Sequence, residues 1–390
     1  MFLMPVGIIL FWISGLLSLS LLGGGCYLIW AWYEGVVVGT MYLVSAIAML
    51  LLSLLGRPLM LAVLGRKSGE PPPVVPKGRP HRLMRPDGSY LYLEEYGPED
   101  APTLILTHGW GLSNVAWRSM KQHLTGRFRV IAWDLAGLGK STRPHKADYS
   151  LEKMAGDLEA VVEFAGPGPV VLVGHSIGGM ITLTFCRLFP HLLGGRVAGL
   201  VLENTTYTNP VKTARFHTLL RFLQKPILEP LLWLQILLLP VMWIMTWLSY
   251  LNGTTHLTTH LTQFGRKETA EQLDFACRFS LYASPSVLAR GMFGMLRYDA
   301  REVLPSIPIP VFVITGDRDQ LTLPEAGATI HETAPKGEIQ EFKPTGHLTL
   351  LEKSTEMDEA VGAFAAICFQ PPIERLFQSA AVQERKHPAF

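Results

Sequence analysis

One serine in this 390-residue chain stands where a strand would turn sharply into a helix. In the stretch "LVGHSIGGM", Ser176 lies between Gly174 and Gly178, which is the GxSxG pattern of a nucleophile elbow. The apolar run before it indicates a strand buried on both faces, and "MITLTFCRLF" after it indicates a helix. Glycines allow such a turn because they carry no side chain. The pattern therefore predicts a serine nucleophile, although a five-residue match also arises by chance.

A serine hydroxyl is a weak nucleophile, so a base and an acid must assist it. His347 lies in "PTGHLTLLE", on a glycine turn that follows the expected strand "EIQEF". The stretch "VITGDRDQLTLP" places Asp317 and Asp319 after another apolar strand, and Asp319 is the preferred acid. The order serine, acid, histidine is expected when the three groups follow strands of one sheet. We therefore predict that His347 takes the proton of Ser176 and that Asp319 orients the imidazole.

A tetrahedral intermediate also needs two hydrogen-bond donors for its oxygen. The stretch "THGWG" follows the expected strand "TLIL" and carries glycine on both sides of Trp110, so the backbone N–H of Trp110 is one candidate donor. The N–H of Ile177, directly after the serine, is the other candidate. His108 in the same loop is interpreted as a structural residue that holds the loop.

Composition and spacing indicate neither a metal, a cofactor nor a nucleic-acid partner. His256 and His260 have helical i, i+4 spacing but lack the acidic third ligand of a zinc helix. Acyl transfer through a serine requires no cofactor. The four cysteines lie at scattered positions, which favours a reducing compartment. A formal net charge of +2 argues against binding of nucleic acid.

The strands that these residues follow alternate with helices, which predicts a mainly parallel α/β sheet covered by helices on both faces. In such a sheet the functional groups gather at the carboxyl ends of the strands. The core is expected in two parts, residues 81–204 and 302–370. An insertion at residues 205–301 would form a helical cap, and residues 371–390 a C-terminal tail.

The amino-terminal part of the chain is far more apolar than the rest. Residues 2–55 contain only one charge, and the stretches 6–28 and 36–55 can each cross a bilayer, which needs about 20 apolar residues. We therefore predict a hairpin of two transmembrane helices over residues 1–66. No Lys or Arg precedes Arg57, which disfavours a cleaved signal peptide.

Basic residues follow the second span, so the positive-inside rule places both termini and the catalytic domain in the cytoplasm. Residues 67–80 are rich in proline and glycine and are expected to form an extended tether.

The motifs together resemble those of the α/β-hydrolase superfamily. They are "HGWG", "DLAGLGKS", "GHSIGG", "GDRDQLTLP" and "GHLTLLE", in family order between residues 80 and 370. The resemblance implies the same catalytic and oxyanion roles as above, and a structural role for Asp134. Epoxide hydrolases and haloalkane dehalogenases carry aspartate where Ser176 stands. The "HGW" form of the oxyanion loop resembles that of lipases, monoacylglycerol lipases, esterases and cofactor-free peroxidase-like members, and the motifs do not distinguish these subfamilies.

The expected cap contains another apolar segment. Residues 231–251 are 21 residues without a charge, and by hydropathy alone they could be a third span. A third crossing would separate Ser176 from His347, so a cap that dips into the membrane and gives lipid an apolar entrance is preferred. Two core helices broken at Pro240 are the alternative. The residues expected to contact the membrane are Trp233, Met242, Trp243, Met245 and Trp247.

The predicted function is a membrane-anchored serine hydrolase that cleaves carboxylic esters of lipid-like substrates through an acyl-enzyme. Its partners would be a lipid or small ester substrate and the lipid bilayer. An acyltransferase or a thioesterase could use the same three residues. A hydrolase fold retained as a non-catalytic binding module is the alternative from another class.

Overall fold

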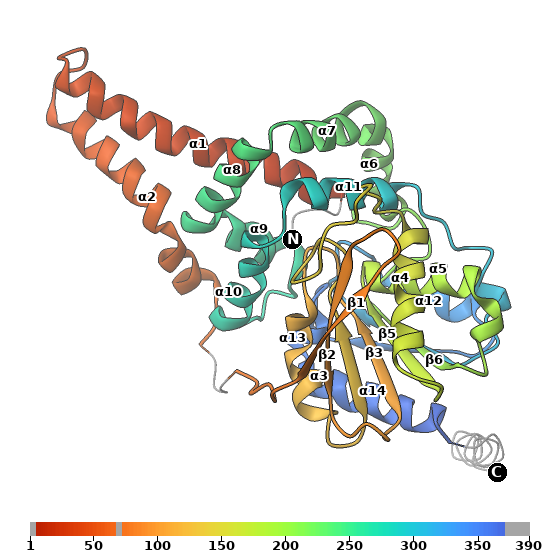
Figure 1. The fold of residues 1–390 in the computed structure, drawn as a ribbon. Coiled ribbons are helices and arrows are strands. Elements are labelled where there is room, and N and C mark those ends of the chain that lie inside the picture. The colour runs from red at the N-terminus through yellow and green to blue at the C-terminus, as the bar shows by residue number, and fades with distance from the viewer. Residues whose placement is uncertain (1–4, 68–71, 371–390) are drawn as a thin grey trace, which may run out of the picture.

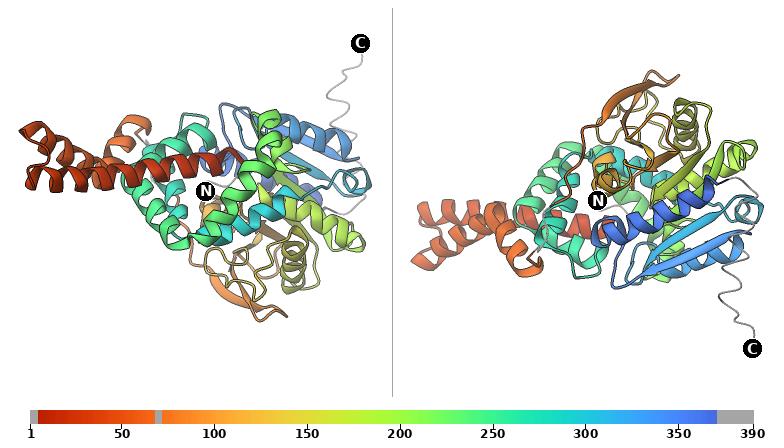
Figure 2. Two further views of the ribbon diagram at one scale, coloured as in Figure 1. Left: turned by 90° about the horizontal axis from the view of Figure 1, so that it is seen from above. Right: turned by 90° about the horizontal axis from the view of Figure 1, so that it is seen from below.

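The computed structural model describes residues 5–67 and 72–370, and the predicted C-terminal tail lies outside them. A sheet with helices on both faces forms the body, and two long helices project from it as an arm (Figure 1). Further helices lie between the arm and the sheet. The views from above and below both show the arm extending from one end of the molecule (Figure 2).

Eight strands form one sheet in the order β1-β2-β4-β3-β5-β6-β7-β8. The pairs β1–β2 and β2–β4 are antiparallel, and the other pairs are parallel. The sheet is therefore mainly parallel, as the sequence predicts. The strands are β1 (Arg79–Met84), β2 (Tyr90–Tyr96), β3 (Thr103–Thr107), β4 (Arg129–Trp133), β5 (Val170–His175), β6 (Val197–Glu203), β7 (Val311–Gly316) and β8 (Gly337–Phe342).

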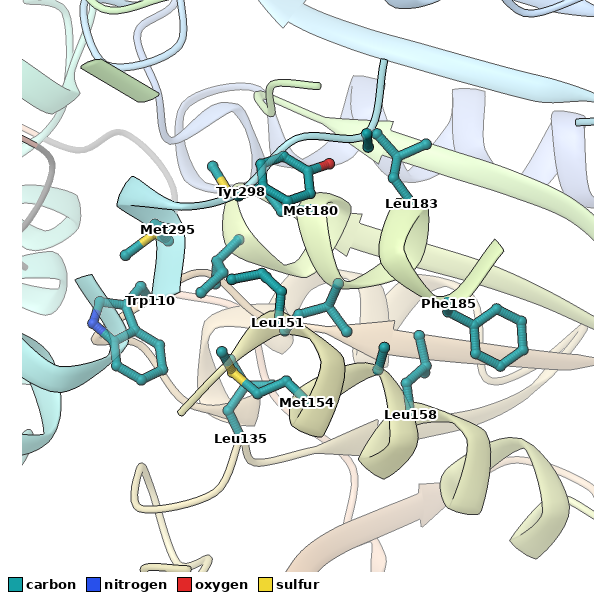
Figure 3. Close-up of a cluster of buried hydrophobic side chains, with 14 of the residues drawn as sticks. Trp110, Leu135, Leu151, Met154, Leu158, Met180, Leu183, Phe185, Met295 and Tyr298 are labelled. Atoms are coloured by element: carbon teal, nitrogen blue, oxygen red, sulfur yellow. The ribbon is translucent and has the colours of Figure 1, made fainter. Parts of the chain in front are cut away.

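Helices cover both faces of the sheet because successive side chains of a strand point to opposite faces. In β3, Ile105 joins one apolar cluster, whereas Leu104 and Leu106 join the other. The helices of the body are α3 (Arg118–His123), α4 (Leu151–Phe164), α5 (Ile177–Leu188), α12 (Pro324–Thr333), α13 (Thr349–Glu352) and α14 (Ser354–Cys368). Residues of α4, α5 and α12 pack in the first cluster and those of α3 and α14 in the second. Figure 3 shows part of the first cluster, with Leu151, Met154, Leu158, Met180 and Phe185.

The segment between β6 and β7, which we call the cap, contains α6 (His217–Leu223), α7 (Glu229–Leu237), α8 (Leu239–Leu251), α9 (Thr254–Gln263), α10 (Ala270–Arg278) and α11 (Pro285–Leu296). The helical stretches His217–Leu237 and Leu239–Leu251 meet at an angle of 100°. Pro240 lies in the first turn of α8, where its missing N–H needs no partner. The apolar segment 231–251 is thus divided between two helices that run in different directions.

The arm consists of α1 (Pro5–Tyr33) and α2 (Thr40–Leu64), and both helices are long and apolar enough to cross a membrane. α1 extends beyond the predicted span 6–28, and α2 begins and ends later than the predicted span 36–55. β1 begins at Arg79, within the segment predicted as a tether.

The arm packs against the cap. Phe11 of α1 forms a buried cluster with Met242 and Met245 of α8. Both methionines are fully buried there, so the prediction that they contact the membrane is wrong. The other three predicted lid residues are at least partly exposed: Trp233, Trp243 and Trp247.

Small and polar residues allow α1 and α8 to approach closely. Ser18 Oγ lies 3.2 Å from Ser249 Oγ and accepts a hydrogen bond of 2.7 Å from Asn252 Nδ2. A Cβ at Gly15 would collide with the side chain of Met245. Arm and cap therefore share a specific interface.

Candidate active site

Ser176 follows β5 directly and precedes α5, at the carboxyl edge of the sheet. Its backbone has φ 55° and ψ −117°, a conformation that residues with side chains rarely adopt. A Cβ at Gly174 would collide with the backbone of Gly178, and a Cβ at Gly178 with the carbonyl of Thr107. The two glycines are therefore required by the close approach of strand, turn and helix.

The structure brings the predicted serine, histidine and aspartate into one hydrogen-bonded row. His347 Nε2 lies 3.0 Å from Ser176 Oγ, and His347 Nδ1 lies 2.8 Å from Asp319 Oδ2. All three residues are buried. Asp319 comes from the loop after β7 and His347 from the loop after β8, so both reach the sheet edge where Ser176 lies.

The electrostatics of Asp319 determine the direction of these hydrogen bonds. Burial alone would raise the pKa of this carboxyl, but His347 and hydrogen bonds from Thr322 and Asn204 outweigh burial, so the pKa lies below its usual value. An ionised carboxylate can only accept, so His347 Nδ1 donates to it. In the neutral imidazole, Nε2 is then free to accept the hydroxyl proton of Ser176. This arrangement can withdraw a proton from the serine.

Two side chains that hold Asp319 are missing from the sequence prediction. Asn204 Nδ2 donates to Asp319 Oδ2 at 2.9 Å, and Thr322 Oγ1 donates to the same oxygen at 2.7 Å. Asn204 directly follows β6 at the same sheet edge, and Thr322 lies within the motif "GDRDQLTLP". Because both residues follow expected strands, their positions in the sequence could have indicated that they lie near the site.

The cap holds the loop that carries His347. The N–H of His347 donates to the carbonyl of Gln263 at the end of α9, at 2.8 Å. Glu352 accepts the N–H of Gly265 at 2.8 Å and that of Gly346 at 2.7 Å. Gly265 and Glu352 are 87 residues apart in the chain, so no local pattern predicts this contact.

His175, the residue before the serine, also supports the loop. Its Nε2 lies 3.1 Å from the carbonyl oxygen of His347 and therefore donates to it. Burial lowers the pKa of His175 well below its usual value, so the ring is neutral. His175 thus holds the backbone of His347 without adding a positive charge beside it.

Ser176 opens into a small cavity of about 30 Å³, which we name the central chamber. Trp110 lines the chamber, and its indole Nε1 donates to the carbonyl of Leu288 in α11 at 3.0 Å. Ile177 is the first residue of α5, so its N–H belongs to the first turn, where amides lack partners inside the helix. The other residues that line the chamber include Leu112, Gln263, Met295 and Leu321.

The remaining residues discussed from the sequence have structural partners. Asp317 accepts the N–H of Thr345 at 2.9 Å and so holds the turn before the histidine loop. His108 is fully buried, and its Nε2 accepts the N–H of Leu135 at 3.0 Å. Asp134 accepts backbone N–H groups from two neighbouring loop segments.

Comparison with known proteins places this fold in a family. The sequence model of a family described as the alpha/beta hydrolase fold matches residues 102–354. The chain belongs to the alpha/beta hydrolase family. The matched range contains strands β3 to β8 and all three residues of the hydrogen-bonded row.

Curated proteins similar to this alpha/beta hydrolase include esterases. A pimeloyl-acyl-carrier-protein methyl ester esterase from Methylococcus capsulatus is 43% identical over 112 residues, which are 29% of this chain and 39% of the relative. A bifunctional esterase/perhydrolase from Acinetobacter calcoaceticus is 37% identical over 106 residues, 27% of this chain and 38% of the relative. The chain thus matches about two fifths of the length of these relatives.

Solved structures with a similar fold include two hydrolases. A membrane phospholipase A, described as a bacterial virulence factor, has a TM-score of 0.59 at 21% identity and covers 89% of this chain and 98% of its own. An esterase from Rhodococcus has the same TM-score and identity but covers 74% of this chain and 98% of its own. The match to the phospholipase therefore includes a larger part of this alpha/beta hydrolase.

Proposed function

We propose that this alpha/beta hydrolase is a membrane-anchored serine esterase that cleaves lipid-like carboxylic esters. The observation that carries the proposal is the row Ser176–His347–Asp319, in which His347 Nε2 lies within hydrogen-bonding distance of Ser176 and His347 Nδ1 within that distance of Asp319. The row lies at the carboxyl edge of the sheet in a family whose members similar to this chain include esterases.

In the proposed reaction, Ser176 Oγ attacks the ester carbonyl while His347 takes its proton, and Asp319 stabilises the imidazolium. The N–H groups of Trp110 and Ile177 stabilise the negative oxygen of the tetrahedral intermediate. His347 returns the proton to the alcohol as the bond between carbonyl carbon and alcohol oxygen breaks. Water, deprotonated by the same histidine, then releases the acid from the acyl-enzyme.

The arm supports attachment to a membrane. Exposed apolar side chains cover both arm helices, and they include Leu17, Tyr33, Leu55 and Val63. Burial of this surface in hydrocarbon is favourable, and each helix exceeds the length needed to cross it. The basic residues that follow α2 favour a cytoplasmic body with the tip of the arm on the opposite side.

The cap supports a lipid-like substrate. Phe222, Trp233 and Leu237 expose more than half of their surface on α6 and α7, close to the base of the arm in Figure 1. Such a surface can lie in the membrane interface beside the arm and admit a lipid to the site. The similarity in fold to a membrane phospholipase A is consistent with this class of substrate.

Labelling with a fluorophosphonate tests the nucleophile. The reagent should modify the wild-type protein in detergent micelles and leave Ser176→Ala unmodified. Ser280→Ala is the matched control, because Ser280 is buried outside the site and donates to the carbonyl of Cys277. A folded wild-type protein that does not react, or equal labelling of Ser176→Ala, would contradict the proposal.

Product analysis tests the reaction class. With an ester substrate and an added alcohol or thiol acceptor, the proposed esterase should release mainly free acid. Acyl products on the acceptor as the main outcome would instead identify an acyltransferase. Turnover by wild type that disappears in Ser176→Ala would exclude a non-catalytic binding module.

A further inference from the structure

The central chamber cannot hold a lipid ester by itself. Its volume is about 30 Å³, whereas sites for small-molecule ligands measure about 300–1,000 Å³. Two cavities of suitable size lie next to it. One measures about 580 Å³ and lies between α7, α11 and the start of α4, and the other measures about 380 Å³ and lies between α10 and the loop after β3. An ester substrate has two parts, an acyl chain and an alcohol, so each part could occupy one of the two cavities.

Contacting or shared side chains lie between the chamber and each cavity. Trp110 lines the chamber and Tyr149 lines the larger cavity, and their rings meet edge to face with centroids 6.2 Å apart. Figure 3 shows Trp110 and Met295, both chamber residues, near Leu151, which lines the larger cavity. Leu112 lines both the chamber and the smaller cavity. Movements of these side chains would join the three spaces.

We name the larger space the charged cavity, since seven of its lining residues are acidic or arginine. Part of this charge is compensated by two ion pairs, Glu152–Arg187 and Asp299–Arg301. Within the described part of the chain, the charged lining residues that form no ion pair are Asp148, Glu229, Arg290 and Arg297. The cavity is therefore lined by two arginines outside ion pairs and by two carboxylates that accept hydrogen bonds from the Ser150 N–H and from Gln224 but form no ion pair in the described part of the chain.

Unpaired charges of both signs suit a zwitterionic group. Guanidinium groups bind phosphate in directed, charge-assisted hydrogen bonds. Carboxylates attract ammonium, and the face of an indole attracts quaternary ammonium. Trp233 lines this cavity, is 59% exposed and packs against Phe293 with ring centroids 5.1 Å apart. Tryptophan favours the depth of lipid head groups, so the charged cavity would open at that level.

We name the smaller space the apolar cavity. Val115, Phe275, Phe279 and Ala283 line it together with Leu112, the residue shared with the chamber. The charges at its edge are compensated, because Arg278 pairs with Asp274 and Asp134 accepts backbone N–H groups. Such a lining favours a hydrocarbon chain.

We propose that the substrate is a zwitterionic glycerophospholipid or lysophospholipid. Its phosphate would bind at Arg290 and Arg297 in the charged cavity, and its acyl chain would enter the apolar cavity beyond Leu112. This proposal rests on the proposed function, because it assigns the two parts of the ester that Ser176 attacks.

The head-group assignment is tested with lysophosphatidylcholine and a monoacylglycerol that carry the same acyl chain. Arg290→Gln and Arg297→Gln should each lower kcat/KM on lysophosphatidylcholine by about 10-fold, since a charge-assisted hydrogen bond is lost. Both variants should retain wild-type kcat/KM on the monoacylglycerol. Arg127→Gln, at an exposed arginine outside both cavities, should match wild type on both substrates.

Equal losses on both substrates, or no loss on either, would overturn the head-group assignment. The proposed function fails in a different way, namely if the wild-type protein cleaves neither ester or if Ser176→Ala cleaves them as fast as wild type.

The acyl-chain assignment is tested with p-nitrophenyl esters from acetate to palmitate. Val115→Trp adds bulk at a partly exposed edge of the apolar cavity and should lower kcat/KM on long-chain esters by about 10-fold relative to acetate. Leu188→Trp, at an exposed end of α5 outside both cavities, should leave the chain-length profile unchanged. A Val115→Trp profile identical to wild type would overturn this assignment.

Discussion

The body and the junction between arm and cap each contain a buried aspartate that pairs with a histidine. Asp319 pairs with His347 in the body, and Asp274 Oδ1 lies 3.2 Å from His256 Nε2 at the junction. Burial would raise the pKa of both carboxyls, but their partners outweigh it and lower both. The two pairs differ in the partner of the histidine ring nitrogen that does not face the aspartate. His347 Nε2 meets Ser176, whereas His256 Nδ1 has no hydrogen-bond partner in the part of the chain described.

At the junction, Asp274 instead connects helices. It accepts a hydrogen bond of 2.8 Å from Arg57 of α2, one of 3.1 Å from Tyr250 of α8 and one of 2.8 Å from Arg278 of α10. The same residue pair can thus prepare a reaction or hold an anchor in place. The role depends on the third group: Ser176 lies beside His347 in the body, and Arg57 of the arm binds Asp274 at the junction.

The largest expected effect is a difference in kcat between substitutions of Asp319 and of Asp274. Asp319→Asn should lower kcat about 10³-fold or more, because asparagine no longer holds the imidazole in the required tautomer. Asp274→Asn, the matched change at the junction, should leave kcat near the wild-type value. Ester hydrolysis in detergent measures both. Comparable losses in the two variants would remove the functional distinction between the two pairs.

The free energy of unfolding should depend on Asp274 because it is shared by two arginines. Asp274→Asn should lower the free energy of unfolding by about 2 kcal/mol or more, because Arg57 and Arg278 keep their charges and lose a shared partner. Asp299→Asn, at a more exposed ion pair with Arg301, should cost less than about 1 kcal/mol. Unfolding in detergent, followed by circular dichroism, measures the difference. An Asp274→Asn variant as stable as wild type would show that this aspartate does not secure the arm.

A third carboxylate, Glu352 beside the histidine loop, should respond to pH in the opposite sense. Burial raises the pKa of Glu352 to about 8 from a usual value of 4.5, so the folded protein keeps a proton there that the unfolded chain has lost. Its contribution to stability therefore declines as pH rises from about 5 to about 8. The lowered pKa of Asp274 makes its contribution decline as pH falls below about 4 instead.

Glu352→Gln should therefore flatten the decrease of Tm between about pH 5 and about pH 8. Glu356→Gln, at an exposed residue that pairs with Lys353, should retain the wild-type slope. A wild-type slope in Glu352→Gln as well would mean that Glu352 does not titrate in this range.

The smallest expected effect concerns the exposed face of the cap. Trp247→Ser should lower activity on vesicle-bound esters several-fold, because less apolar surface enters the membrane interface, and should not change activity on short soluble esters. Leu188→Ser is a control at an exposed position on the body. Equal effects on both kinds of ester would contradict a role of the cap in membrane contact.

Deletion of residues 1–66 would be a less direct test of the cap. Met242 and Met245 are buried against α1, so removal of the arm would expose a new apolar face on α8. Binding of the truncated protein to vesicles could then reflect this new surface. Point substitutions leave the interface between arm and cap intact and avoid the difficulty.

The sequence by itself determined the parts of this protein that depend on neighbouring residues. The turn at Ser176 is local, since it requires glycines two residues away on either side and a strand directly before it. The loops of Asp319 and His347 follow apolar strands, and parallel strands bring their carboxyl ends to one edge. The sequence also predicts α1 and α2 as helices that can cross a membrane, because bilayer thickness sets the number of apolar residues required.

Only the tertiary structure decided how the arm, the cap and the site are connected. Arg57 and its partner Asp274 are 217 residues apart, and neither lies in a pattern that names the other. Met242 and Met245 carry the same apolar signal as the tryptophans around them, yet they are buried against α1 while Trp233 and Trp247 are exposed. Hydrophobicity predicts that a side chain leaves water, but it is non-directional, so packing alone selects the surface that receives the side chain.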